Sequence, residues 1–180
     1  FPFPLFFCLS IWCSTPASAQ WIELDPHFPD SLNLITYGIS VVDENVVWGN
    51  PLRNIAPNAD PNRYFFKTID GGQNWTLGYM EEASDGWWQN VSIFALDANT
   101  AWVSRLNAPG EDSSEVLLTT DGGDVWVRKT PPFTNPVNAL TGLYFFNHQE
   151  GAVWGETFNG TQWSCLLYTS PIPRDRTRSR

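Results

Sequence analysis

The sequence has few residues of the kinds that build metal sites and disulfides. Its 180 residues include three cysteines and two histidines. Cys8 and Cys13 lie near the start and Cys165 near the other end, so the middle of the chain has no cysteine pair and cannot rely on a disulfide framework. His27 and His148 stand 121 positions apart, which argues against a local zinc site. We expect neither a bound metal nor a cofactor.

Positive charge is also scarce. Between positions 20 and 170 there are six lysines and arginines against eighteen acidic residues, a difference of minus twelve. Such a surface repels phosphate backbones and lacks the clustered cations whose counterion release drives nucleic-acid binding. We therefore expect no nucleic-acid partner, and solubility is the simpler explanation of the charge.

Sequence typical of long helices is missing as well. There is one methionine, whereas ten tryptophans, twelve phenylalanines and five tyrosines stand beside 13 glycines and 14 prolines. This balance favours short aromatic strands between many turns. A chain of this length normally forms one domain with a real core.

The first twenty residues, FPFPLFFCLSIWCSTPASAQ, are interpreted as an export leader. They are apolar as far as Trp12 and then turn small, with Ala17 and Ala19 in the spacing that a signal peptidase reads. We expect a signal peptide over 1–19, a mature start near Gln20 and a sequence that begins part-way into the leader. No second apolar run is long enough to span a membrane, so export is favoured over anchoring. A buried N-terminal strand is the alternative.

The last ten residues, 171–180, do not match the rest of the chain. Arginine stands at 174, 176, 178 and 180, which makes four of the ten basic residues. The stretch CLLYTSPIPRDRTRSR resembles translated sequencing-adapter sequence, and we interpret 171–180 as a non-native tail. A solvated basic tail and an anion-binding arm are the alternatives.

A unit of about fifty residues repeats between these ends. KTIDGGQNW at 67–75 is nearly repeated by TTDGGDVW at 119–126, with Trp75 and Trp126 51 positions apart. Trp21 stands 54 positions before Trp75 and is expected to take the same structural place.

A second series of tryptophans supports this period. The stretches ISVVDENVVWGN, IFALDANTAWVS and LYFFNHQEGAVWGE end around Trp48, Trp102 and Trp154, at spacings of 54 and 52. A unit of this length that contains several short strands is typical of a propeller blade, which buries its faces only against neighbouring blades.

The sequence therefore predicts an all-β fold, a β-propeller of four-stranded antiparallel blades, over residues 20–170. Strands are expected near 36–42, 46–50, 62–68 and 74–80, then near 90–96, 101–105, 114–120 and 125–130, then near 142–146 and 151–156 with a third strand reaching 168. These make blades at about 36–80, 90–130 and 141–168, or about two and a half blades.

Both boxes resemble the Asp-box, Ser/Thr-x-Asp-x-Gly-x-x-Trp, also called the BNR repeat. The matching positions are Thr68, Asp70, Gly72 and Trp75 in the first box and Thr119, Asp121, Gly123 and Trp126 in the second. The stretches VVDENVVWG and ALDANTAWV, which precede the boxes, resemble blades of exported bacterial propellers, especially Bacteroidetes proteins with a type IX secretion sorting domain. Photosystem II assembly factors, sortilin ectodomains, sialidases and xyloglucanases share the box. The resemblance implies that the box is structural, so we assign both aspartates to turns and not to catalysis.

Any ligand is expected on the side opposite the boxes. Because antiparallel strands alternate in direction, the longer loops at 50–62, 81–90, 106–114 and 131–139 leave from that side. The candidate ligand-binding residues are Trp87, Trp88, Arg53, Asp60 and Arg105. An exposed indole can stack on a sugar, but in a tryptophan-rich propeller the Trp87–Trp88 pair can equally serve to pack adjacent blades, which is the interpretation we favour.

Two functions remain open. One is a non-catalytic exported module at the cell surface or outside the cell, which acts as a scaffold or binds an extracellular protein or a glycan. The other is a glycoside hydrolase of the xyloglucanase or sialidase type. No G-x-S-x-G or glycine-rich phosphate loop is present, and the Arg-Ile-Pro signature of sialidases is absent. A closed propeller has about four to eight blades, so we expect the stretch around Trp21 to complete a final blade in a longer protein and residues 20–170 alone to associate or aggregate.

Overall fold

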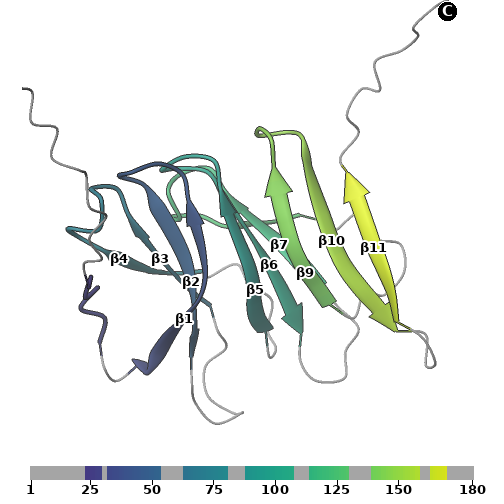
Figure 1. The fold of residues 1–180 in the computed structure, drawn as a ribbon, viewed down its shortest axis with the longest axis horizontal. Coiled ribbons are helices and arrows are strands. Elements are labelled where there is room, and N and C mark those ends of the chain that lie inside the picture. Colours follow the sequence, from purple (N-terminus) through teal and green to yellow (C-terminus); the bar gives the residue numbers. More distant parts are fainter. Residues whose placement is uncertain are drawn as a thin grey trace, which may run out of the picture.

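The computed structural model describes residues 23–29, 32–53, 63–80, 88–107, 114–129, 139–158 and 163–169. These residues form eleven β-strands in three antiparallel sheets, which follow one another across the molecule in chain order (Figure 1). Among them, no helix is long and apolar enough to cross a membrane. The predicted all-β class, with four-stranded antiparallel blades of the propeller kind, is confirmed.

Each sheet is a meander in which every strand pairs with the next one along the chain. The first sheet contains β1 (Leu34–Val41), β2 (Val47–Arg53), β3 (Tyr64–Thr68) and β4 (Thr76–Tyr79). The second contains β5 (Trp88–Ala95), β6 (Ala101–Asn107), β7 (Ser114–Thr119) and β8 (Val127–Lys129). The third contains β9 (Ala139–Phe145), β10 (Gly151–Phe158) and β11 (Trp163–Thr169). Each strand expected from the sequence overlaps one of these.

One hairpin turn recurs in all three sheets and explains why the second strand begins where it does. Asp43 Oδ1 accepts hydrogen bonds from the amides two and three residues further on, at 2.7 and 2.8 Å. Asp97 Oδ1 does the same at 2.7 Å in both cases, and Asn147 Oδ1 at 2.8 and 2.9 Å. A short side chain with an oxygen at this position closes the turn locally.

This turn aligns the repeats and corrects the second tryptophan series. Trp48 and Trp102 both lie five residues after the capping residue of their turn, on the second strand of their sheet, where the third sheet has Ala152. Trp154 instead pairs with Gly142, two residues further along β10. Its grouping with the other two is therefore wrong in register, although the side chain projects from the same face because strand side chains alternate.

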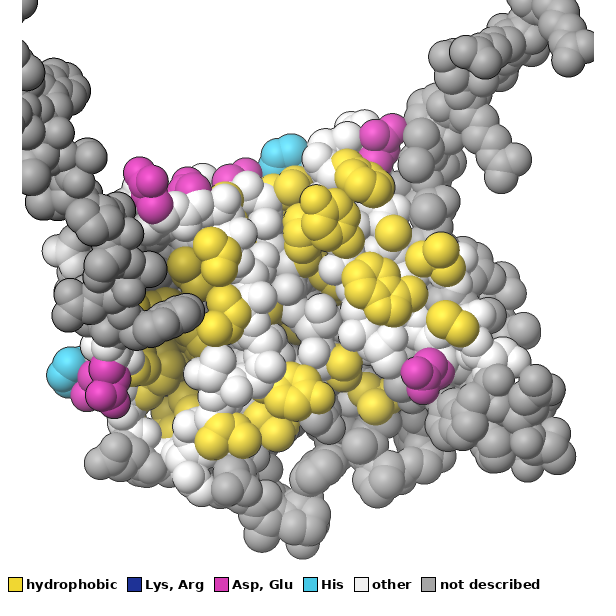
Figure 2. Space-filling view, in the orientation of Figure 1, with side chains coloured by type: hydrophobic (Ala, Val, Ile, Leu, Met, Phe, Trp, Pro, Cys, Tyr) yellow, Lys and Arg dark blue, Asp and Glu magenta, His cyan; other side chains and the backbone are white. Residues whose placement is uncertain are grey.

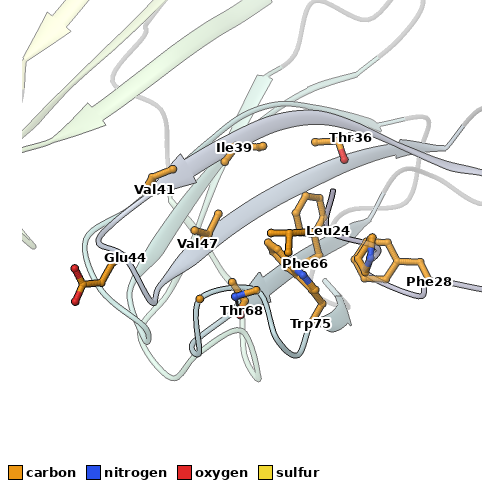
Figure 3. Close-up of a pocket in the computed structure, with 13 residues that line it drawn as sticks. Leu24, Phe28, Thr36, Ile39, Val41, Glu44, Val47, Phe66, Thr68 and Trp75 are labelled. Carbon is orange, nitrogen blue, oxygen red and sulfur yellow. Dashed lines mark hydrogen bonds between the residues drawn. The ribbon is translucent and has the colours of Figure 1, made fainter. Parts of the chain in front are cut away.

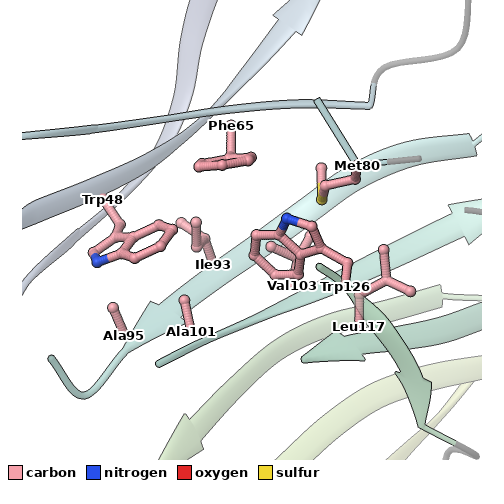
Figure 4. Packing of buried hydrophobic residues seen from close by; sticks show 9 residues of the cluster. All are labelled: Trp48, Phe65, Met80, Ile93, Ala95, Ala101, Val103, Leu117 and Trp126. Atoms are coloured by element: carbon pink, nitrogen blue, oxygen red, sulfur yellow. The ribbon is translucent and has the colours of Figure 1, made fainter. Parts of the chain in front are cut away.

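Neighbouring sheets pack face to face. We call the side of a sheet that faces the preceding sheet its front face and the side toward the following sheet its back face. The front face of the first sheet is therefore the side away from the second sheet, and the back face of the third sheet is the side away from the second. Between the first two sheets lies a cluster of buried side chains (Figure 4): Trp48, Phe65, Met80, Ile93, Ala95, Ala101, Val103, Leu117 and Trp126. The ring centroids of Trp48 and Phe65 are 5.5 Å apart, and Trp126 meets Phe65 edge-on at 5.3 Å.

The second and third sheets repeat this arrangement. Trp102, from the back face of the second sheet, stacks on Phe145 of the third with ring centroids 3.9 Å apart and planes 8° apart. Val116 joins Trp102 against the buried Leu143 and Val153. The central sheet is thus covered on both faces, and its strand β7 is buried over consecutive residues instead of alternating.

Polar bonds also tie the first sheet to the second. The Trp48 indole Nε1 donates a hydrogen bond to the carbonyl oxygen of Asp97, at 3.0 Å. Lys67 Nζ donates to the carbonyl oxygens of Gly122 and Ala98, at 2.6 and 3.3 Å, and lies 4.8 Å from the centroid of the Trp48 ring. Each of these donors crosses from the first sheet to a turn of the second, so the sheets are held in register as well as in contact.

The contact between sheets explains which turn glycine matters most. Gly72 and Gly123 hold the same place in the two boxes, with φ of 87° and 99°, so alanine strains the backbone at both. A methyl group at Gly123 would overlap the buried ring of Phe65, whereas at Gly72 it would lie 2.9 Å from Cδ1 of Leu24, a side chain that is 54% exposed.

We expect Gly123→Ala to lower the free energy of unfolding by about 1–3 kcal/mol more than Gly72→Ala, because only the former overpacks the interface between sheets. Urea unfolding followed by tryptophan fluorescence measures the difference. Equal losses in the two variants would contradict the packing of Phe65 on this turn.

Candidate functional site

The two box turns carry the same hydrogen-bond network. In the first, the Thr68 hydroxyl accepts from the amide of Gly72 at 2.9 Å and donates to Asp70 Oδ1 at 2.8 Å. In the second, the Thr119 hydroxyl accepts from the amide of Gly123 at 2.9 Å. It donates to Oδ1 of the box aspartate, Asp121, at 2.8 Å.

The aspartates of the two boxes bind the far end of each turn. Asp70 accepts from the amide and the side-chain amide of Asn74, at 2.9 and 2.7 Å, and Asp121 accepts from the amide of Val125 at 3.0 Å. These bonds, first among them those from the backbone amides of Asn74 and Val125, lower the pKa of both carboxyl groups. The aspartates therefore stay ionised at neutral pH and act as acceptors.

The buried part of each network is the threonine and not the aspartate. Thr68 and Thr119 are buried, and so are the glycine amides that they bind. From the sequence, both aspartates were assigned to turns. In the structure, Asp121 is exposed and bonds the exposed amide of Val125, while the threonine hydroxyl serves the buried one.

Both boxes dock on the hairpin turn of the same sheet. The amide of Gly71 donates to the carbonyl oxygen of Asn45 at 3.0 Å, and the amide of Gly122 donates to that of Asn99 at 2.9 Å. In the first and second sheets, the turn between the first two strands and the turn between the last two therefore lie side by side at the same end of the strands. We call this end of the strands the box edge, and the other end the opposite edge. The strand ends that lead into the longer connections lie at the opposite edge, as strand alternation requires.

Arg105, a candidate ligand residue from the sequence, lies buried near that opposite edge. Its Nη1 donates to Glu115 Oε1 at 2.9 Å, and Arg128 Nε is 2.9 Å from Glu115 Oε2. Burial lowers the pKa of Arg105 to about 10, and the charge of Glu115 opposes this shift. The guanidinium therefore stays charged at neutral pH, but it is fully covered and does not face solvent.

Two asparagines add a buried polar strip between the first and second sheets. Asn50 Nδ2 donates to the carbonyl oxygen of Asn90 at 3.4 Å, and Asn90 Nδ2 donates to that of Tyr64 at 3.0 Å. The side-chain oxygens of both asparagines are buried and accept no hydrogen bond from the described residues. Sequence reasoning missed this strip, because the two asparagines stand 40 positions apart and no local pattern joins them.

Of the other four candidate ligand-binding residues, the structure places the backbone of two. Arg53 ends β2 and Trp88 begins β5, so both backbones lie at the edge opposite the boxes. Trp87 and Asp60 lie outside the described residues.

The two histidines are exposed and far apart in the chain. His27 Nε2 lies 3.7 Å from Asp25 Oδ2, and His148 Nε2 lies 3.9 Å from Asp97 Oδ2. Within the described ranges no three His, Cys, Asp or Glu side chains form a group that could hold a metal.

An apolar hollow of about 580 Å³ lies on the front face of the first sheet (Figure 3). Its walls come from β1, β2, β3, the first box and the segment 23–29, and include Leu24, Phe28, Ile39, Val41, Phe66 and Trp75. Leu24 and Phe28 reach over the sheet, with the rings of Phe28 and Phe66 5.5 Å apart. Glu44 is the acidic side chain of this lining.

Comparison with known proteins gives no family. No protein-family model matches the sequence, and no curated protein matches it. A solved structure described as "YCF48 bound to D1 peptide" is similar, with 18% identity and a TM-score of 0.46 over 74% of this chain and 41% of that one. The present chain thus spans less than half the length of that protein.

The depressed pKa values of Asp70 and Asp121 predict an acid-dependent loss of stability. Because both are lower in the folded than in the unfolded chain, their contribution is complete above the unfolded value of about 4 and is lost as the pH falls through the folded value. We expect the urea midpoint to fall below about pH 4, and to fall less in the Asp70→Asn/Asp121→Asn double variant. An unchanged acid dependence would contradict this role.

The buried ion pair predicts a loss of stability at neutral pH when its carboxylate is removed. Glu115→Gln removes the carboxylate that lies 2.9 Å from the buried Arg105 guanidinium, so we expect it to lower the free energy of unfolding by about 3–5 kcal/mol. Lys129→Gln in the same sheet, at an exposed position, serves as the matched control. Urea unfolding at pH 7 measures both variants, and a loss no larger than that of the control would show that the pair contributes nothing to stability.

Proposed function

We propose that this chain is a non-catalytic β-propeller module of the Asp-box type, which is exported and binds a protein or a glycan at the cell surface or outside the cell. The apolar leader over 1–19 supports export, with a mature start near Gln20. The Asp-boxes support the family, and the resemblance of the stretches VVDENVVWG and ALDANTAWV to blades of exported bacterial propellers supports secretion of the type IX kind.

The use of charged side chains inside the scaffold carries this proposal. Asp70 and Asp121 are engaged in the box turns, and Arg105 is buried against Glu115. Glycoside hydrolysis needs two carboxyl groups that flank the scissile bond. The hollow on the front face of the first sheet has Glu44 as the one acidic side chain of its lining. Rigid sheets with loops at one edge suit recognition, since such scaffolds hold binding loops in place.

The ligand is proposed to bind at the edge opposite the boxes. The strands that end or begin there, at Arg53, Trp88 and Asn107, lead into connections of several residues, whereas the box edge carries tight turns. The backbone of Trp88 lies at this edge, so its indole is the first side chain to test for stacking against a sugar or an aromatic side chain.

A glycan panel that includes xyloglucan oligosaccharides and sialyllactose tests the proposal with the full chain. Titration calorimetry is expected to detect binding of a glycan, and chromatography of the same mixtures is expected to detect no released sugar. Trp88→Ala should weaken binding at least about tenfold, the loss of roughly 1.4 kcal/mol that one stacking contact supplies. Val125→Ala, exposed in a box turn at the other edge, should leave the affinity unchanged.

Two results would count against the proposal. Release of reducing sugar or sialic acid would favour the glycoside hydrolase instead. Equal weakening by Trp88→Ala and Val125→Ala would contradict the assignment of the binding edge.

A further inference from the structure

The second sheet has an ion pair at a position where the other two sheets have none. The first strand of each sheet contains a β-bulge, and the residue just before the bulge gives a common reference position. At this position Thr36 pairs with Pro51 in the first sheet, Asn90 with Arg105 in the second and Leu140 with Gly155 in the third. On the next strand, Glu115 pairs with Arg105, whereas Leu166 pairs with Gly155. The ion pair of Arg105 and Glu115 is therefore not part of the repeat.

Stability alone does not account for this pair. A buried ion pair contributes little or nothing to stability when it is compared with apolar side chains that fill the same volume. The third sheet has glycine and leucine at the two positions, and the adjacent Leu140 is fully buried. The fold thus accepts uncharged residues here, which points to a separate role for Arg105 and Glu115 in the second sheet.

The pair is connected to the surface through Arg128. Glu115 Oε1 lies 2.9 Å from Nη1 of the buried Arg105, and Glu115 Oε2 lies 2.9 Å from Nε of Arg128. Arg128 pairs in register with Leu117, so its side chain leans along β7 toward the opposite edge to meet Glu115. That side chain is half exposed. The three charged groups thus form a line from the interior to the surface at this edge.

This line holds the guanidinium of Arg128 in place. Glu115 cannot readily turn away from Arg128, because its other oxygen is bound to the buried Arg105. The ion pair with Glu115 involves Nε of Arg128, so the Nη donors of the guanidinium remain for a further group. A carboxylate matches the geometry of these donors, and a donor group that is already held loses little freedom when it binds.

The described cations gather around this line. Burial lowers the pKa of Arg105, and the nearby charges of Arg63 and Arg128 lower it further. Three of the six lysines and arginines between positions 20 and 170 therefore lie close together. The box edge differs, since Asp43 and Asp97 cap its turns and Figure 2 shows acidic side chains in a row along it. Within the described part of the chain, this distribution favours an anionic ligand beside Arg128 over one at the box edge.

We propose that Arg128 binds a carboxylate of an acidic sugar at the opposite edge, and that Glu115 and Arg105 are positioning residues that hold its guanidinium there. The assignment rests on the proposed function, glycan binding at this edge, and it names the ligand class as a glycan that contains uronic acids. Arg128 lies on β8 and Trp88 begins β5, the two outer strands of the second sheet. The strand order β5-β6-β7-β8 separates them by roughly 14 Å, a distance that an oligosaccharide of several sugars spans.

Titration calorimetry of the full chain with a short oligogalacturonate is the test. The same oligosaccharide with its carboxyl groups methyl-esterified is the matched neutral probe. We expect the charged form to bind at least about tenfold more tightly than the ester, because only the charged form offers carboxylates to the guanidinium. Trp88→Ala should weaken both forms alike, since stacking does not depend on the carboxylate.

Variants of Arg128 test its role and that of the positioning residues. Arg128→Gln should lower the affinity for the charged form at least about tenfold and leave that for the ester unchanged. Glu115 keeps Arg105 as its partner in this variant, so the urea midpoint should change little. Arg128→Lys keeps the charge but loses the fork, and it should bind the charged form as weakly as Arg128→Gln does. Lys129→Gln removes the same charge from the next, exposed position and should leave both affinities unchanged.

Each contrary result has a distinct meaning. If both forms bind equally and Trp88→Ala weakens both, the role of Arg128 is wrong while the proposed function stands. If Arg128→Lys binds as the wild type does, charge alone is enough and the positioning role of Glu115 and Arg105 is wrong. Tighter binding of an oligoglutamate peptide than of oligogalacturonate would overturn the choice of a glycan. Binding of neither form would overturn this assignment, whereas the wider glycan panel tests the proposed function independently.

Discussion

A sheet of four short strands has two faces, and in this chain neither face can be buried within its own sheet. The contact on which the rest of the structure depends is therefore the one between neighbouring sheets, where Trp48 and Phe65 of the first meet Trp126 of the second. Large aromatic side chains supply most of the buried apolar area in such a contact. The same contact recurs where Trp102 stacks on Phe145. With no disulfide in the described part of the chain, this packing has to supply the cohesion.

The local devices of the fold serve that contact. The threonine, aspartate and glycines of each box close a turn. In the second box, this turn brings Trp126 to the interface, and Gly123 leaves space for the ring of Phe65. The recurrent hairpin turn offers a backbone carbonyl at Asp97 to the Trp48 indole. The polar bonds across the interface set the register of one sheet on the next, while the aromatic contact supplies the attraction. The Asp-box turn, whose aspartate could be mistaken for a catalytic residue in the sequence, thus contributes to the packing between sheets.

The function of the chain depends on the side chains and surfaces that the scaffold does not use. Its most distinctive charged groups serve structure, as acceptors in exposed turns or as the covered pair of Arg105 and Glu115. What remains for recognition is of two kinds: connections that leave one edge of the sheets, and apolar faces at the two ends of the stack. We assign the connections to an external ligand.

The sequence by itself determined the period, the strands and the turns of this protein, because these depend on near neighbours. Two boxes 51 positions apart placed Thr68, Asp70, Thr119 and Asp121 in turns at one edge of their sheets. Only the tertiary structure decided which side chains are covered. Arg105 looked available for a ligand but is buried beside Glu115, and Asn50 and Asn90 meet although they stand 40 positions apart. The meeting of the two asparagines depends on what the second sheet places opposite the first, and no local pattern in the sequence records that.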